Sequence, residues 1–133
     1  MERIKNPIVF IFFGIIAIAI VSCDPGVQDD YIIVNNSDKY IEVNTILNFR
    51  DSVQIFEVKP QQEYLFYSVS GIGNSPLEVE RVFKSIQIGI LDSISNENYA
   101  NSVHWSIIEE VKNNRWSYHF YHYLYITNEN FQD

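Results

Sequence analysis

The chain has 133 residues, with 17 acidic and 9 basic side chains, a formal net charge of −8, and a single cysteine. Its hydrophobic fraction of 47% excludes an intrinsically disordered protein, and its length suits one domain. One cysteine excludes an internal disulfide and a multi-thiolate zinc site, and the acidic balance argues against a nucleic-acid partner.

Residues 1–22 have the features of a secretory signal peptide. Arg3 and Lys5 precede an uncharged apolar run from Ile8 to Val21. A membrane-spanning helix needs about 20 apolar residues, so this run is short for a span and fits the apolar region of a signal. We therefore expect an N-terminal signal helix that is removed from the mature protein.

The end of the apolar run resembles the lipobox of bacterial lipoproteins. It reads Ile20, Val21, Ser22 and Cys23: an aliphatic residue, a branched residue, a small residue and the cysteine. The resemblance implies cleavage between Ser22 and Cys23 and acylation of Cys23, which anchors the protein to a membrane of the cell envelope, expected to be the outer membrane. Two or more acyl chains hold a protein firmly on a bilayer. The alternative is a free cysteine after an uncleaved membrane helix.

Residues 23–30 are predicted to be a flexible tether that links the acylated cysteine to the folded domain. A Pro-Gly pair interrupts regular structure in this segment, and acidic side chains keep it solvated. The acidic residues are Asp24, Asp29 and Asp30. Acids in this position resemble, loosely, a sorting or surface-export signal of some Gram-negative lipoproteins. Calcium binding is less favoured, because the segment has no regular ligand loop.

The remaining chain consists of short apolar runs separated by turn residues, the pattern of an all-β domain. Strands are predicted at residues 31–34, 39–48, 53–58, 62–68, 85–91 and 115–127. Residues 53–67 are expected to form a hairpin, because Pro60 suits a turn and cannot continue a central strand. Gly89 is a candidate bulge within its strand.

Two further segments are ambiguous. Residues 77–83 alternate like a strand but also suit a helical turn, and residues 103–111 fit a helix or a strand. The Asn-Asn pair at 113–114 favours a hairpin turn, so a strand is preferred for 103–111. Six or seven strands joined by short turns predict a single antiparallel β-sandwich over residues 31–133.

The last strand, residues 115–127, gives the strongest signal, because aromatic and β-branched residues suit a pleated surface. One face, expected in the core, holds Trp116, Tyr118, Phe120, His122, Leu124 and Ile126. The opposite face, expected to be partly exposed, holds Ser117, His119, Tyr121, Tyr123, Tyr125 and Thr127. Trp105 is also expected in the core.

Three features together resemble the small envelope lipoproteins of Bacteroides-type bacteria. They are the lipobox with its Cys-Asp-Pro-Gly start, the hairpin predicted around Pro60, and the closing Tyr-Leu-Tyr-Ile-Thr-Asn-Glu-Asn-Phe. That resemblance implies an immunoglobulin-like or related sandwich with no established activity.

Motifs for catalysis are missing from the sequence. It contains no nucleophile elbow, no phosphate loop and no His-Glu-x-x-His motif. Gly71 and Gly73 lack the context of a dinucleotide site and are interpreted as turn residues. We expect no catalytic residue, no metal and no small-molecule cofactor.

The candidate bases or nitrogen ligands are His104, His119 and His122. Since His119 and His122 are an odd number of residues apart, a strand sends them to opposite faces, where they cannot share one metal. The adjacent Glu109 and Glu110 are split in the same way, which favours a solvated edge over paired carboxylate catalysis.

The candidate binding face consists of Tyr121, Tyr123 and Tyr125, with His119 on the same side of the strand. Their spacing along a strand is about 6–7 Å, and exposed aromatic rings can stack on sugars or anchor a protein partner. The more ordinary interpretation is a sheet face that is covered by a loop or by residues 103–111.

Ser52 and Ser93 are candidate O-glycosylation sites. They stand in the tripeptides Asp-Ser-Val and Asp-Ser-Ile, which resemble the O-glycosylation signal of Bacteroides-type bacteria.

The sequence as a whole favours a lipid-anchored, non-enzymatic envelope protein that binds a protein or glycan partner. One alternative is a periplasmic enzyme or inhibitor with a site built from the loops at 70–76 and 92–102. The other is a structural subunit of an envelope assembly.

Overall fold

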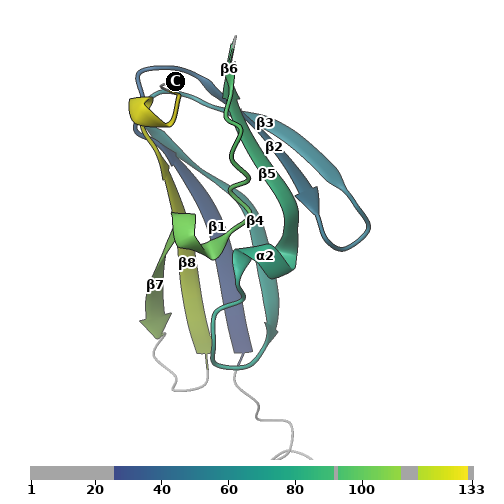
Figure 1. The fold of residues 1–133 in the computed structure, drawn as a ribbon. Helices are drawn as coiled ribbons and strands as arrows, with labels where there is room; N and C mark the ends of the chain where they lie inside the picture. Colours follow the sequence, from purple (N-terminus) through teal and green to yellow (C-terminus); the bar gives the residue numbers. More distant parts are fainter. Residues whose placement is uncertain (1–25, 92, 112–116, 132–133) are drawn as a thin grey trace, which may run out of the picture.

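Two four-stranded β-sheets pack against each other in the computed structural model, which describes residues 26–91, 93–111 and 117–131 (Figure 1). The predicted all-β sandwich is therefore confirmed. The predictions for Ser22, Cys23, Trp116 and the Asn-Asn turn at 113–114 lie outside the described residues. Among the residues described, no helix has both the length and the apolar character to cross a membrane.

Sheet A has the order β4-β1-β8-β7. Its strands are β1 (Gly26–Asn35), β4 (Gln62–Ile72), β7 (Trp105–Val111) and β8 (Ser117–Ile126). β1 runs antiparallel to β4 but parallel to β8. The expectation of a purely antiparallel sandwich is thus wrong at this one pair, which joins strands from opposite ends of the chain.

Sheet B has the order β3-β2-β5-β6, with every neighbouring pair antiparallel. Its strands are β2 (Ile41–Leu47), β3 (Val53–Val58), β5 (Phe83–Ile90) and the short β6 (Ser93–Ile94).

The predicted hairpin over residues 53–67 is wrong. β3 pairs with β2 in sheet B, whereas β4 pairs with β1 in sheet A, so the turn at Pro60 carries the chain from one sheet to the other. The aromatic residues of the two strands meet across the core instead of along a shared ladder. Phe56 and Phe66 stack with ring centroids 5.3 Å apart.

The two ambiguous segments resolve differently. Residues 77–83 contain a single helical turn, α2 (Val79–Val82), whose two valines are buried. In the other segment, a short 3-10 turn, η1 (Ser102–His104), leads into β7, so the preferred strand is confirmed from Trp105 onwards. A second 3-10 turn, η2 (Asn128–Phe131), follows β8.

Gly89 does not form a bulge. The ladder between β2 and β5 stays regular at Gly89 and shifts register instead between Ile46 and Leu47. A Cβ atom at Gly89 would lie 3.2 Å from the carbonyl oxygen of Ser93, so the glycine permits the close approach of β6.

The core lies between the sheets and includes Trp105, as predicted. Its most deeply buried apolar residues are Tyr31, Ile33, Ile41, Val43, Phe83, Ile86, Ile88, Leu124 and Ile126. On β8 the residues at 120, 122, 124 and 126 are buried, which confirms the predicted inward face at these four positions. Tyr118 is only half-buried, and His119, expected on a partly exposed face, is buried.

The predicted tether at residues 23–30 is wrong from Gly26 onwards, because β1 begins there. Asp29 and Asp30, expected in solvent, are only 2% and 5% exposed. Burial of two carboxylates requires partners, and these lie on β8.

Candidate functional site

Two aspartate–histidine pairs connect β1 to β8, one on each face of sheet A. Asp29 Oδ1 lies 2.8 Å from His122 Nε2 on the core side. Asp30 Oδ2 lies 2.6 Å from His119 Nε2 on the outer side. All four side chains are buried. The two histidines therefore lie on opposite faces, as predicted, and each is hydrogen-bonded to its own carboxylate.

The inner pair fixes the segment that precedes α2. Asp29 Oδ1 also accepts a hydrogen bond of 3.0 Å from the backbone N–H of Leu77, and the Tyr31 hydroxyl donates to the carbonyl of Leu77. The Tyr31 ring stacks on His122 with centroids 4.4 Å apart. Burial raises the pKa of Tyr31, so its hydroxyl stays protonated and remains a donor. The inner pair thus has a structural role.

The outer pair belongs to a small polar cluster. Asp30 Oδ1 accepts hydrogen bonds from the Ser68 hydroxyl at 2.7 Å and from the Gln28 side-chain amide at 3.1 Å. Burial raises the pKa of Asp30, but the hydrogen bonds from its neighbours outweigh this and hold the pKa below its ordinary value. His119 Nδ1 is buried and has no hydrogen-bond partner among the described residues.

The order of contacts in this cluster is Ser68, Asp30, His119, with the carboxylate in the middle. A serine nucleophile needs a histidine within reach of its hydroxyl to accept the proton. Here the Ser68 hydroxyl donates to Asp30, whose lowered pKa makes it a weak base. The geometry holds Ser68 and His119 in place and gives Ser68 no histidine base.

Four rings form a ladder along the outer side of β8. The centroid distances are 4.1 Å from His119 to Tyr121, 6.4 Å from Tyr121 to Tyr123 and 6.0 Å from Tyr123 to Tyr125. Each successive pair is stacked, with interplanar angles of 15°, 28° and 22°. The rings therefore stand in a roughly parallel row, which leaves ring surface and hydroxyls for solvent or a partner.

Aliphatic residues on neighbouring strands extend this ladder sideways. The register places Ile32 opposite both Tyr123 and Leu65, and Ile108 opposite Tyr121. Leu65 and Ile108 are about half exposed, and Tyr125 is 46% exposed. We call this surface the tyrosine face. It comprises Ile32, Leu65, Ile108, Tyr121, Tyr123 and Tyr125.

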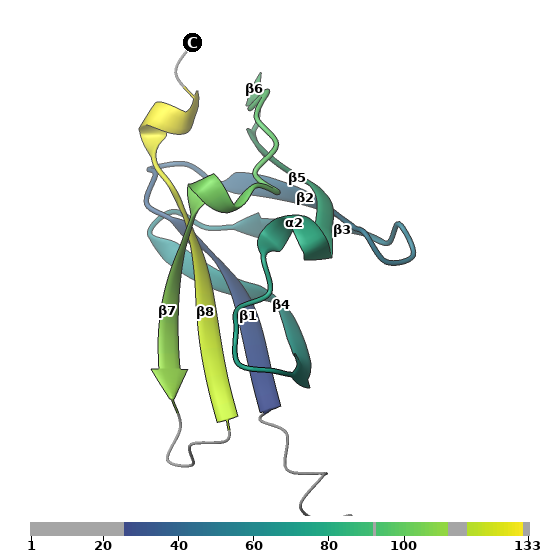
Figure 2. The same cartoon turned by 60° about the horizontal axis from the view of Figure 1, so that its bottom comes forward.

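The tyrosine face is not covered by residues 103–111. That segment forms β7, which lies beside β8 as the edge strand of the same sheet. α2 and η2 contribute Val79 and Phe131 to the core on the opposite side of sheet A. Within the described residues, no helix or strand lies over the tyrosine face (Figures 1 and 2).

Glu110 fixes one ring of the ladder. The Tyr121 hydroxyl donates to its carboxylate at 2.9 Å, and this hydrogen bond raises the pKa of Tyr121. Glu109 lies in the row of Phe120 on the other face, so the predicted split of the two glutamates is confirmed. Both glutamates are exposed.

The remaining predicted residues are spread over the molecule. His104 Nε2 lies 3.4 Å from a carboxylate oxygen of Glu97. Ser52 is exposed at the end of the turn between β2 and β3, and Ser93 is half-buried in β6. Gly73 has a positive φ of 144° just after β4, in agreement with its interpretation as a turn residue. The same interpretation is wrong for Gly71, which lies within β4 and pairs with Val27 of β1.

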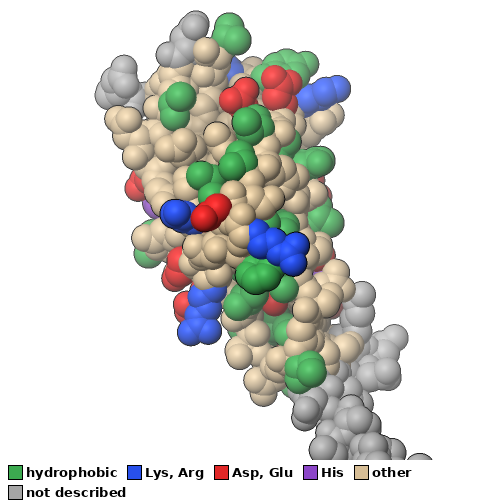
Figure 3. Space-filling view, turned by 90° about the vertical axis from the view of Figure 1, so that its right-hand side faces the viewer, with side chains coloured by type: hydrophobic (Ala, Val, Ile, Leu, Met, Phe, Trp, Pro, Cys, Tyr) green, Lys and Arg blue, Asp and Glu red, His purple; other side chains and the backbone are tan. Residues whose placement is uncertain are grey.

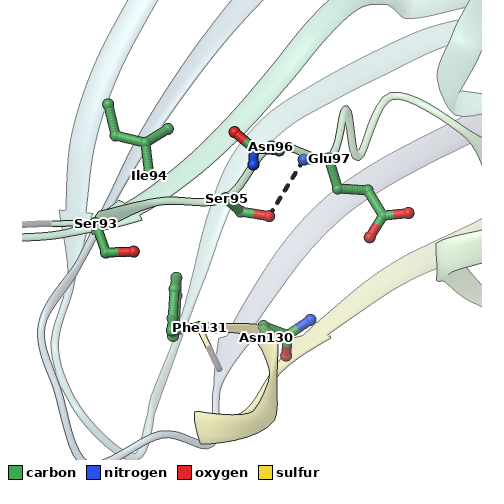
Figure 4. Close-up of a pocket in the computed structure, with 7 residues that line it drawn as sticks. All are labelled: Ser93, Ile94, Ser95, Asn96, Glu97, Asn130 and Phe131. Carbon is green, nitrogen blue, oxygen red and sulfur yellow. Dashed lines mark hydrogen bonds between the residues drawn. The ribbon is translucent and has the colours of Figure 1, made fainter. Parts of the chain in front are cut away.

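The described parts of the segments at 70–76 and 92–102 are spread along the sandwich. β6 and residues 95–97 lie at one end, whereas the connection from β4 to α2 lies at the other end (Figure 1). Ser102, at the end of the second segment, donates hydrogen bonds to the carboxylate of Glu80 in α2. A hollow of about 460 Å³ is lined by Ser93, Ile94, Ser95, Asn96, Glu97, Asn130 and Phe131. Five of these seven residues are polar, and the Ser95 hydroxyl accepts a hydrogen bond from the backbone N–H of Glu97 (Figure 4).

Hydrophobic residues elsewhere on the surface are scattered. The edge strand β3 exposes Val53 and Ile55. Figure 3 shows that hydrophobic side chains on that side are interrupted by charged and polar ones. In the described part of the chain, no group of three or more His, Cys, Asp or Glu side chains is placed to hold a metal ion.

The sequence did not identify Asp30, Ser68 and Gln28 as residues that support the candidate binding face. The spacing of the acids and histidines nevertheless contained evidence for Asp30. Two consecutive aspartates point to opposite faces if they lie in a strand, and so do the two histidines of the last strand. Matching one acid and one histidine on each face would have placed Asp29 and Asp30 next to β8.

No family model matches the chain, and no match was found among curated proteins or among solved structures. The function is therefore inferred from the chain's own residues.

Proposed function

We propose that the protein is a lipid-anchored component of the cell envelope, held by Cys23, that binds a protein partner through the tyrosine face. The observation that carries this proposal is the face itself. It combines three tyrosines with half-exposed aliphatic residues, and no described helix or strand covers it. Exposed patches of this kind on a folded domain mark interaction sites, in which tyrosines often supply much of the binding energy.

A protein partner fits the ladder better than a glycan does. A sugar ring binds an aromatic residue by lying on an open ring face. The tyrosine face instead sets its rings and hydroxyls in a parallel row beside the half-exposed aliphatic side chains of Leu65 and Ile108. Such a mixture matches the side chains and backbone groups of a protein surface.

The outer polar cluster supports this role, because it holds the ladder in place before a partner arrives. Asp30 fixes the ring of His119, His119 stacks on Tyr121, and Glu110 holds the Tyr121 hydroxyl. Rings that are already ordered lose little conformational freedom on binding. The Ser68 hydroxyl is hydrogen-bonded to Asp30 and has no histidine beside it to accept its proton, which supports a non-enzymatic role.

The test is affinity capture from envelope extracts with the full-length, lipidated protein. Tyr123→Ser combined with Tyr125→Ser should weaken capture of a specific partner about 30-fold, the loss expected when one hot-spot residue is removed. Tyr40→Ser, which removes an exposed tyrosine outside the face, should leave capture unchanged. Equal capture by all three proteins would contradict the proposed binding face.

The anchor has a separate readout. Mass spectrometry of the purified protein should find a mature chain that begins at Cys23 and carries acyl groups. An unmodified thiol behind an intact leader would contradict the envelope anchor whatever the capture experiment gives. If partner binding were instead competed by oligosaccharides, the partner would be a glycan.

A further inference from the structure

One end of sheet A lies close, along the chain, to the proposed lipid anchor. β1 begins at Gly26, only three residues after Cys23, so the two Cα atoms are at most about 11 Å apart. The opposite end of β1 is about 30 Å further along the strand. The covalent connection therefore determines which end of the sandwich is near the membrane.

This end, which we call the anchor end, consists of two cross-strand rows of sheet A. The outermost row is Ile72, Gly26 and Ser117, and the next is Gly71, Val27, Tyr118 and Val111. The ends of β1, β4, β7 and β8 lie together there (Figures 1 and 2).

The described residues of the anchor end are uncharged. None of its seven residues carries a charge, and neither does the segment at 73–76 that follows Ile72. Ile72 is 77% exposed and Val111 is 54% exposed. Along the chain, Lys112 and Arg115 lie between Val111 and Ser117, and Asp24 follows Cys23, so two basic residues and one acidic residue flank these rows in sequence. This balance favours approach to anionic lipids, which would repel an acidic surface.

We propose that the anchor end rests on the membrane surface that holds Cys23, with Ile72 and Val111 in contact with lipid. The inference depends on the proposed anchor at Cys23 and adds an orientation to it. Side chains of this kind partition into the boundary between headgroups and acyl chains, and they add to the binding that the acyl chains provide.

This orientation directs the tyrosine face sideways. The strands of sheet A rise from the membrane, so the ladder from His119 to Tyr125 climbs away from the lipid surface. A partner held in the same membrane would then meet the face without any rotation of the domain.

The test uses the full-length, lipidated protein in vesicles of phosphatidylethanolamine and phosphatidylglycerol. Because the thiol of the only cysteine is acylated, Ile72→Cys can be labelled with the polarity-sensitive fluorophore NBD. Ile94→Cys is the matched control, since Ile94 is 69% exposed and belongs to β6 at the opposite end. The label at 72 should gain at least about twofold in fluorescence and be quenched by brominated lipids. The label at 94 should do neither.

Two results separate failure of this inference from failure of the anchor. A protein that floats with the vesicles but gives identical signals at 72 and 94 would overturn the orientation and leave the anchor intact. A protein that does not float at all would overturn both. Val111→Cys provides a second probe, which should behave like position 72.

Discussion

Asp30 bears a negative charge while 5% exposed, and three donors replace its hydration. Because its pKa is lowered from an ordinary value near 3.9, its stabilising effect is fully present above about pH 4 and is lost as the pH falls through the lowered folded-state pKa. We predict that Asp30→Asn lowers the unfolding free energy by about 1–3 kcal/mol at neutral pH. The difference from the unsubstituted protein should shrink as the pH falls below about 4. Urea unfolding at several pH values measures both quantities.

Glu42→Gln is the control for this substitution. It also removes one negative charge, but from an exposed position on β2, so its effect should stay within about 0.5 kcal/mol at neutral pH. If the difference caused by Asp30→Asn grew as the pH fell, the assignment of Asp30 as a stabilising carboxylate would be wrong.

The segment that leads into α2 depends on two side chains of β1. Asp29 accepts from the N–H of Leu77, and Tyr31 donates to its carbonyl, so both backbone groups of one residue are satisfied. We predict that Tyr31→Phe lowers the unfolding free energy by about 1 kcal/mol, because the Leu77 carbonyl loses its partner. Hydrogen exchange in residues 73–82 should become faster, while that in β2 stays close to the global rate.

Tyr67→Phe is the appropriate comparison for that experiment. Tyr67 packs near Tyr31, with ring centroids 6.4 Å apart, but its substitution leaves both hydrogen bonds of Leu77 in place. Equal acceleration of exchange by the two substitutions would show that the Tyr31 hydroxyl does not hold this segment.

Features that a local sequence pattern encodes were predicted correctly, and features that depend on a distant segment of the chain were not. The alternation in β8 is visible within ten residues, so the faces of His119, His122 and the tyrosines followed from the sequence. The start of β1 did not, because Asp29 and Asp30 are typical of a solvated linker until a strand some 90 residues later supplies their histidines.

Strand pairing also depends on distant contacts that the local sequence does not show. The turn chemistry at Pro60 is identical whether the next strand returns in the same sheet or crosses to the other one. The pairing of β4 with β1, between segments about 40 residues apart, decides that the chain crosses to the other sheet. Likewise, the Asn-Asn pair at 113–114 favoured a strand for residues 103–111, but only the ladder with β8 shows that this strand extends the tyrosine face instead of covering it.

The molecule as a whole joins its anchor, its anchor end and its binding face through one strand, β1. The short connection from Cys23 to Gly26 therefore controls how the domain stands on the membrane. We predict that an insertion of 12 Gly and Ser residues after Pro25 preserves folding and acylation but releases the domain from the surface. Such a flexible chain has a typical end-to-end distance of about 20 Å, enough for the anchor end to leave the lipid for much of the time.

The measurement is the NBD fluorescence of the Ile72→Cys protein in vesicles, with and without this insertion. The longer connection should bring the emission at 72 close to that at 94, because only the short connection keeps Ile72 near the acyl chains. An insertion of the same length after Phe49, in the exposed turn between β2 and β3, leaves the connection unchanged and should leave the signal unchanged. If the signal at 72 survived the longer connection, the apolar side chains of the anchor end would hold the domain on the membrane by themselves. The short connection would then not determine how the domain stands on the membrane.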